Sequence, residues 1–390
     1  MTPSTSPAQS RRILVVDDGI GVWGSHRCLL RLAPFFEAHN FTLGLLSPFG
    51  SDFSSVWEKE GFEHTYYFEP RVEGLSVRDA KGKLRPLKMA TTALALVGRA
   101  ARISQVARKF RADIILANSF WTHFDVAATS AVTRRSALLY LHEECSPGLP
   151  ATALRTAVRF SQSTIAVSND VAASVNLPER VQVINNGIDI ERFTPGPLNP
   201  ALRSELATDP QQPLVVSISR LDEAKQVDHI IRAVAELEGP LANTQLAIIG
   251  DATSGSSYYQ ELITLGDELL SGRVRFLPWQ SDVPEILRSA DVFVLAGKQE
   301  GMPLGVLEAQ ASGCSVVAYP AAGVRDSVIH GQTGMVATPN EWSSLSKNIT
   351  QVLNDEGLRR RIEVNARRLI EERFTLDHQA EQMTRVLDGL

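Results

Sequence analysis

The sequence predicts an α/β protein built from two doubly wound parallel sheets that face a central cleft. Short apolar segments alternate with helical patterns through most of the 390 residues, and several of those segments are apolar throughout. Such strands are covered on both faces, as in parallel sheets, and their alternation with helices is typical of doubly wound folds. The alternation breaks once, at residues 185–200, which are rich in Asn, Gly and Pro. The chain is also too long for one typical core.

The first half contains a series of short aliphatic and aromatic runs. Helical patterns lie between them, for example at residues 25–39 and 151–162. We expect strands at residues 13–18, 41–48, 64–70, 112–119, 136–143, 163–169 and 181–187.

The same alternation restarts after the linker, with a helical pattern at residues 226–239 and a helical tail at residues 343–374. Strands are expected at residues 213–220, 244–251, 273–279, 291–297 and 314–320. These patterns predict an N-terminal domain over residues 1–190 and a C-terminal domain over residues 191–375. A last helix, at residues 376–390, is expected to pack back towards the first domain.

Composition excludes several classes of protein. A net charge of −5 argues against a general nucleic-acid binder. Cys28, Cys145 and Cys314 are too far apart for a zinc site or a disulfide framework, so we expect unpaired thiols in a reducing compartment. The first twelve residues lack the apolar core of a signal peptide, and no apolar stretch reaches the roughly 18 residues of a spanning helix. We therefore expect a soluble, cytoplasmic protein.

Two basic residues follow the first strand of the second half. Arg220 and Lys225 stand in a loop just before a helical pattern. Ligands of such sheets bind beyond the carboxyl ends of the strands, and two cations beside a helix N-terminus suit a diphosphate. The alternative is a pair of solvated loop charges.

Two glutamates follow a later strand in the same way. Pro303 suits a helix start, so Glu300 is expected in the loop before the helix and Glu308 inside the helix, near its N-terminal end. An ionised carboxylate only accepts hydrogen bonds, which suits sugar or ribose hydroxyls. The alternative for each glutamate alone is an acid stabilised by the helix dipole.

These segments, "SRLDEAK" and "EGMPLGVLEAQASGCSVVA", resemble the retaining glycosyltransferases of the GT-B fold, family 4. "NNGID", "FTPG" and "HGQTGMV" also fit that family. The resemblance covers most of the second half and is weaker in the first. It implies a nucleotide-sugar-binding C-terminal domain and an acceptor-side N-terminal domain. The implied donor is a UDP- or GDP-sugar, with no further cofactor.

The resemblance also implies roles for individual residues. Arg220 and Lys225 would bind and stabilise the leaving diphosphate, Glu300 would approach the donor sugar, and Glu308 would hold the ribose. His142, at the end of a strand in the first domain, would lie near the transferred sugar; the alternative is a structural histidine. Further donor contacts are implied for the residues that follow Glu300, namely Gly301, Met302, Pro303 and Leu304.

The chain departs from the family pattern in two places. The first glycine-rich loop lacks the usual paired glycines, so Gly21 and Gly24 are both candidates for close approach to the diphosphate. A later loop has Ala322, Gly323 and Asp326 where the family usually shows two glycines and a glutamate, which puts its sugar contacts in doubt.

The implied reaction is glycosyl transfer with retention at the anomeric carbon. The cations would stabilise charge on the leaving group, and no Asp-x-Asp motif suggests a required metal. Two alternatives stay open: a phosphorylase or sugar-nucleotide epimerase on the same fold, and a non-catalytic carbohydrate-binding protein.

A basic segment bears on the acceptor. Residues 71–111 contain eleven lysines or arginines and two acids, and the later part has helical spacing of apolar residues. Such a helix can lie on an anionic membrane surface, which would suit a lipid-linked or cell-envelope glycan as acceptor and a peripheral position at the membrane. The alternative is a packed helix with a solvated basic face. The apolar residues of the helical part are Leu87, Met89, Leu94, Val97, Ile103 and Val106.

Overall fold

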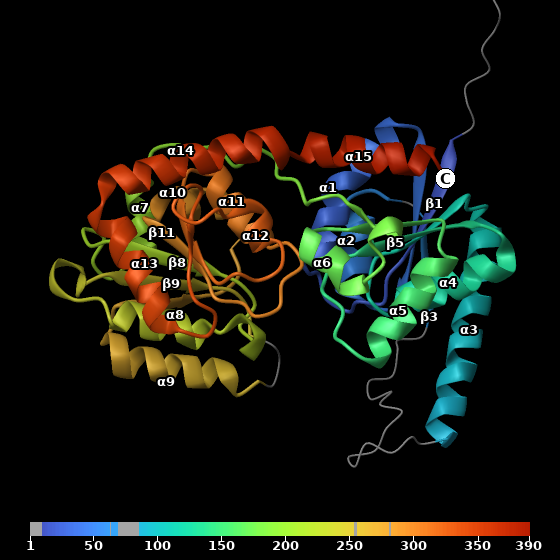
Figure 1. The fold of residues 1–390 in the computed structure, drawn as a ribbon, viewed down its shortest axis with the longest axis horizontal. Helices are drawn as coiled ribbons and strands as arrows, with labels where there is room; N and C mark the ends of the chain where they lie inside the picture. Colours follow the sequence, from blue (N-terminus) through green and yellow to red (C-terminus); the bar gives the residue numbers. More distant parts are fainter. Residues whose placement is uncertain (1–9, 63, 69–85, 253–255, 281) are drawn as a thin grey trace, which may run out of the picture. The chain divides into compact units, whose positions relative to one another are not determined.

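The structure, a computed structural model, describes residues 10–62, 64–68, 86–252, 256–280 and 282–390 (Figure 1). The chain forms two compact units. The first runs to Ile184 and includes Ala380–Leu390, and the second is Asn185–Gln379. Each unit is a parallel sheet with helices on both faces, so the two Rossmann-like α/β domains expected from the sequence are confirmed.

The sheet of the first unit has the order β3-β2-β1-β4-β5-β6-β7, with all neighbours parallel. The chain winds outward from β1 to β3 and then returns to β4 on the other side of β1. The carboxyl ends of β1 and β4 therefore flank a topological switch point. The strands are β1 (Arg11–Val16), β2 (Phe41–Pro48), β3 (Thr65–Phe68), β4 (Ile114–Ala117), β5 (Ser136–Leu141), β6 (Ser163–Ala166) and β7 (Gln182–Val183).

Helices of the first unit follow its strands in turn. The side chain of Ser51 caps α2 and that of Ser168 caps α6, each accepting a backbone N–H of the first turn. The helices are α1 (Gly24–Ala38), α2 (Asp52–Lys59), α3 (Pro86–Phe110), α4 (Thr122–Thr133), α5 (Leu149–Phe160), α6 (Asn169–Val175) and the 3₁₀ turn η1 (Pro178–Arg180).

The second unit repeats the design with the order β10-β9-β8-β11-β12-β13, again parallel throughout. Its switch point lies between β8 and β11, since β9 and β10 extend the sheet on one side and β12 and β13 on the other. The strands are β8 (Leu214–Ile218), β9 (Gln245–Ile249), β10 (Val274–Leu277), β11 (Val292–Leu295), β12 (Ser315–Ala318) and β13 (Met335–Val336).

Helices cover both faces of this second sheet (Figure 1). The final helix of the chain, α15 (Leu376–Asp388), begins in the second unit but belongs mostly to the first. The others are α7 (Pro200–Leu206), η2 (Glu223–Lys225), α8 (Val227–Ala235), η3 (Gly239–Leu241), α9 (Tyr258–Leu270), α10 (Val283–Ser289), α11 (Leu304–Ala311), α12 (Val324–Ser327), α13 (Trp342–Asn354) and α14 (Glu356–Arg373).

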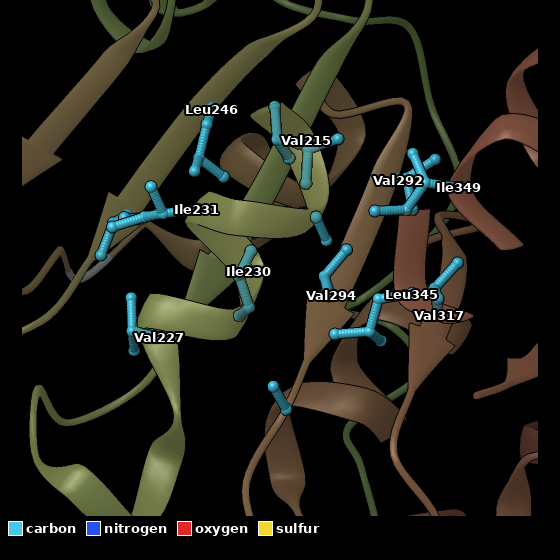
Figure 2. Close-up of a cluster of buried hydrophobic side chains, with 14 of the residues drawn as sticks. Val215, Val227, Ile230, Ile231, Leu246, Val292, Val294, Val317, Leu345 and Ile349 are labelled. Carbon is cyan, nitrogen blue, oxygen red and sulfur yellow. The ribbon is translucent and has the colours of Figure 1, made fainter. Parts of the chain in front are cut away.

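A large apolar cluster fixes the switch-point strands of the second unit. Figure 2 shows Val227, Ile230 and Ile231 of α8 against side chains of the sheet. The strand residues, among them Val215 of β8 and Val292 of β11, are fully buried. Burial of this apolar area holds both strands, and so the loops that leave them, in one register.

The expected linker starts inside the second unit. The Asn186 side chain donates to the Met302 carbonyl, and the Gly187 amide donates to Gln379 Oε1. A Cβ at Gly187 would lie 2.3 Å from the carbonyl oxygen of Thr375, so this approach needs glycine. The strand expected at residues 181–187 ends at Val183; Ile184 still donates to the Ala166 carbonyl, and the second unit begins at Asn185.

Candidate functional site

The loop after β8 carries the two predicted cations. Arg220 lies 3.3 Å from Asp222, and the side chain of Asp222 accepts the Ala224 amide at the start of η2. The loop is tied to the next one, because a Cβ at Gly250 would lie 1.8 Å from the Ser219 carbonyl oxygen. Gly250 has φ of +153°, which also favours glycine. Both loops thus approach each other at the carboxyl edge of the sheet.

An ion pair joins the loops on the two sides of the switch point. Lys225 Nζ donates to Glu300 Oε1 at 2.7 Å, and the two side chains are only 12% and 10% exposed. The backbones meet beside the pair, where the Lys298 amide donates to the Ala224 carbonyl. A Cβ at Gly297 would lie 2.3 Å from Glu300 Oε1, so a glycine makes room for the carboxylate.

The segment between the two glutamates packs against the loop after β12. Gly323 has φ of +70°, and a Cβ there would lie 2.6 Å from the Gly301 carbonyl oxygen and 2.5 Å from Met302 Cα. Pro303 stands at the N-cap of α11, and no side chain of the described residues caps this helix. The N-terminus of α11 therefore presents its backbone N–H groups beside the Lys225–Glu300 pair.

Glu308 lies deeper than expected. It is in the middle of α11 rather than near its N-terminal end, and it is largely buried. Glu300, in contrast, lies in the loop before the helix, as expected. The two carboxylates thus have different surroundings, which suits binding of different groups better than one acid–base pair.

Polar side chains also gather at the switch point of the first unit. Asp17 follows β1, Asn118 follows β4 and His142 follows β5. Asn118 donates from Nδ2 to Asp17 Oδ2 at 2.8 Å, and its Oδ1 lies 3.0 Å from His142 Nε2. His26 of α1 adds a contact from Nε2 to Asp17 Oδ1 at 3.0 Å.

Burial keeps two histidines of this region neutral. Desolvation lowers the pKa of His142 to about 3, and the neighbouring His123 acts in the same direction. Desolvation also lowers the pKa of His123 to about 4, although its bond to the Tyr140 carbonyl opposes the shift. At neutral pH both rings therefore act as neutral donors and acceptors.

Close packing in the first glycine-rich loop falls on the predicted Gly21 and also on Gly19, which was not predicted. A Cβ at Gly19 would lie 2.7 Å from His26 Nε2, so His26 reaches Asp17 only past a glycine. A Cβ at Gly21 would meet the Trp23 ring at 2.7 Å, whereas one at Gly24 would meet nothing within 4 Å.

The later part of α3 is packed into the first unit. Ile103 and Val106 are buried, while Val97 is exposed. Arg99 donates to Asp125 at 2.7 Å, and Arg102 donates to the Tyr67 carbonyl. Residues 71–85 and the side chains of residues 86–94, with Leu87, Met89 and Leu94, lie outside the described part.

Three further observations limit the chemistry. The three cysteines are buried, and no disulfide joins them. The described residues contain no group of three or more His, Cys, Asp or Glu side chains that could hold a metal ion. None of the helices in the described part of the chain is long and apolar enough to cross a membrane.

The structure thus brings the predicted residues into two groups. Arg220, Lys225, Glu300 and the segment 301–304 meet at one switch point, and His142, Gly21 and Gly24 belong to the other unit. Asp17, His26 and Asn118 were missed. The only signal for Asp17 and Asn118 was the presence of polar residues directly after strands, in "VVDD" and "LANS", and His26, inside α1, had no such signal.

Two known protein families match the two halves of the chain. The family described as "Glycosyl transferases group 1" matches residues 199–369, and "Glycosyltransferase Family 4" matches residues 24–192. A D-inositol 3-phosphate glycosyltransferase of Mycobacterium sp. (strain KMS) is 33% identical over 180 residues, 45% of this chain and 40% of that protein. One from Nocardia farcinica is 32% identical over 194 residues, 48% of this chain and 43% of that protein. The matches therefore span less than half the length of these relatives.

Solved structures match over nearly the whole chain. HepE of Anabaena, crystallised with UDP and glucose, is 25% identical with a TM-score of 0.81, and the match covers 97% of this chain and 100% of HepE. The lipopolysaccharide outer core galactosyltransferase WaaB is 16% identical with a TM-score of 0.71, over 97% of this chain and 100% of WaaB. The second likeness supports the fold alone.

The neutral, buried His123 predicts a pH dependence of stability. Its pKa is about 6.5 in an unfolded chain and about 4 when folded. Between these values the unfolded state binds a proton that the folded state does not, so the free energy of unfolding falls as pH is lowered. One such group accounts for about 2 kcal/mol between pH 7 and 5.

His123→Gln tests this, because glutamine can still donate to the Tyr140 carbonyl but does not titrate. In urea unfolding, the loss of stability from pH 7 to 5 should be smaller by about 2 kcal/mol in His123→Gln than in the wild type. His39→Gln, which changes an exposed histidine, should leave the wild-type slope. An unchanged slope in His123→Gln would refute the assignment.

Proposed function

The chain belongs to the glycosyltransferases of group 1 and family 4, and we propose that it transfers a sugar from a UDP-sugar to a hydroxyl acceptor with retention at the anomeric carbon. The observation that carries the proposal is the Lys225–Glu300 pair at the β8–β11 switch point. Anabaena HepE has been crystallised with UDP and with UDP-glucose, which supports UDP as the nucleotide part of the donor.

The second unit would bind the donor. Arg220 and Lys225 would hold the diphosphate, together with the N-terminus of α11 and its residues Met302 to Leu304. Arg220 is 46% exposed, so it can turn from Asp222 towards a ligand. Lys225 has three N–H donors and can bind a phosphate oxygen while it keeps its bond to Glu300.

The reaction breaks the bond between the anomeric carbon and the diphosphate oxygen and forms a bond to the acceptor oxygen. The acceptor's proton leaves with the diphosphate. Negative charge grows on the leaving oxygen as the bond breaks, so the two cations and the helix N-terminus bind the transition state more strongly than the ground state. No metal is needed in this scheme, because the charge is met by side chains and backbone N–H groups.

The glutamates would recognise the two sugars of the donor. Glu300 is held by Lys225 next to the diphosphate, so its second oxygen would accept a hydroxyl of the transferred sugar. Glu308, further along α11, would accept the ribose hydroxyls. Neither is placed as a free acid or nucleophile of the glycosidase type, and this is consistent with a retaining transfer in which the cations carry the catalysis.

The first unit would serve the acceptor side. His142 would lie near the transferred sugar, and the loop with Gly21 and Gly24 would approach the diphosphate. The acceptor would be a lipid-linked or cell-envelope glycan. The basic segment 71–111 would then contact an anionic membrane surface. Because Arg99 and Arg102 bond within the first unit, this contact would fall on the basic residues before them.

Substitution of the switch-point pair tests the mechanism. Lys225→Ala and Glu300→Ala should each lower turnover of UDP-glucose by roughly 100-fold or more, because each removes a contact to the reacting groups. Each should also cost about 1–3 kcal/mol of stability, since a mostly buried charge loses its partner. Lys298→Ala, which removes an exposed lysine two residues before Glu300, should retain turnover.

Turnover is measured as UDP release, and retention as the anomeric coupling constant of the product by proton NMR. Near-wild-type turnover in both variants would refute the mechanism. An inverted anomer would refute retention. Sugar phosphate formed only in the presence of inorganic phosphate would indicate a phosphorylase.

Vesicle binding tests the membrane contact. Lys81→Gln with Lys83→Gln should weaken binding to vesicles of anionic lipid by roughly 30-fold, because each lysine near the surface contributes about 1 kcal/mol. Arg360→Gln with Arg368→Gln removes the same charge from exposed positions of α14 and should leave co-sedimentation unchanged. Equal binding of the wild type to neutral and anionic vesicles would refute the contact.

A further inference from the structure

Four buried or partly buried side chains of the first unit form one continuous chain of hydrogen bonds. It runs from His26 through Asp17 and Asn118 to His142, with contacts of 3.0, 2.8 and 3.0 Å. Asp17 is fully buried and Asn118 almost so. Each link has a donor and an acceptor, and the identity of the first donor decides all the others.

A backbone amide sets the first link. The Trp23 N–H donates to His26 Nδ1 at 2.9 Å. A backbone N–H can only donate, so Nδ1 of His26 carries a lone pair and the ring proton is on Nε2. His26 therefore donates to Asp17 Oδ1, which also accepts the Gly19 amide at 2.7 Å.

Asp17 then sets the orientation of Asn118. Two N–H groups, those of His26 and Gly19, donate to Oδ1 of Asp17, and hydrogen bonds of this kind favour the ionised carboxylate although burial opposes it. The carboxylate is thus ionised and only accepts. It requires the amide nitrogen of Asn118 at Oδ2, which turns Asn118 Oδ1 towards His142.

We propose that this chain of hydrogen bonds holds the His142 ring in the tautomer with its proton on Nε2. Nδ1 of His142 then accepts a hydrogen bond from a hydroxyl of the transferred sugar. His26, Asp17 and Asn118 act as positioning residues. The proposal rests on the proposed function for the identity of the ligand. His142 would thus accept a hydrogen bond from a hydroxyl, whereas Lys225 would bind phosphate as a cation.

Asp17→Asn changes one heavy atom and should invert the tautomer. In this variant, the position that accepts hydrogen bonds from His26 and Gly19 must still hold the side-chain oxygen of residue 17. The new amide nitrogen therefore takes the position of Oδ2. Asn118 must then turn its oxygen to position 17 and its amide nitrogen to His142. Nε2 of His142 becomes the acceptor, and its proton moves to Nδ1.

The double variant Asp17→Asn, Asn118→Asp exchanges carboxylate and amide. The carboxylate at position 118 accepts from both neighbours, so the proton should return to Nε2 of His142. Ser119→Ala is the matched control: Ser119 adjoins Asn118 but bonds to Asp18, outside the chain. It should leave the tautomer unchanged.

Nitrogen-15 NMR of labelled histidine reads the tautomer directly. The protein has eight histidines, and His142→Asn assigns the signal. At pH 7 the wild type should show His142 protonated at Nε2 only, Asp17→Asn at Nδ1, and the double variant at Nε2 again. His123 is an internal reference, because its Nε2 bonds the Tyr140 carbonyl in every variant. A wild-type ring protonated on Nδ1, or an uninverted Asp17→Asn, would overturn the proposal, and the wild-type result decides it even if Asp17→Asn does not fold.

Ligand binding and turnover supply the second readout. The Nδ1 resonance of His142 should move on addition of UDP-glucose but not of UDP, which lacks the transferred sugar; no movement with UDP-glucose would overturn the hydroxyl contact. Asp17→Asn should lower turnover roughly tenfold or more through misplaced contacts while UDP affinity stays unchanged. If the tautomers are as expected but the protein transfers no sugar from any UDP-sugar, the proposed function is refuted. The assignment of the ring protons is then still confirmed.

Discussion

The second unit depends on the ion pair between Lys225 and Glu300. Its 2.7 Å contact joins the loops that leave β8 and β11. Between these two strands the order in which the chain adds strands to the sheet reverses. Taking both charges largely out of water is costly, and their mutual attraction and hydrogen bond offset that cost. The pair places an ammonium and a carboxylate side by side beside the N-terminus of α11. A diphosphate and a sugar hydroxyl require the same combination of groups.

The first unit carries an ionised carboxylate among neutral side chains at its own switch point. Its switch point carries a buried carboxylate, Asp17, whose acceptor-only chemistry propagates through Asn118 to His142. Both units depend on glycines where side chains or loops approach closely, at Gly19 in one and at Gly297 and Gly323 in the other. The same topology thus supplies two polar sheet edges, one with an ion pair and one with a buried carboxylate bonded to neutral side chains.

The parts that sequence could predict are those encoded locally. Apolar runs and helical periodicity gave both sheets, and polar residues after strands placed Arg220, Lys225, Glu300 and His142 at sheet edges. The pairing of these residues could not be predicted, because Lys225 and Glu300 are 75 positions apart and Asp17 and Asn118 are 101 apart. The direction of each hydrogen bond depends on packing, as at Trp23 and His26. The position of Glu308 was misjudged because α11 already ends at Ala311, so its fifth residue lies in the middle of the helix.

The central claim is that the switch point between β8 and β11 binds the donor diphosphate. Hydrogen–deuterium exchange with saturating UDP tests it most directly, because bound phosphate protects the amides that hold it. The account predicts that UDP slows exchange in residues 219–226 and 301–307 more than anywhere else in the second unit, and that Lys225→Ala abolishes this protection. Protection concentrated elsewhere in the unit, or unchanged in Lys225→Ala, would contradict the account.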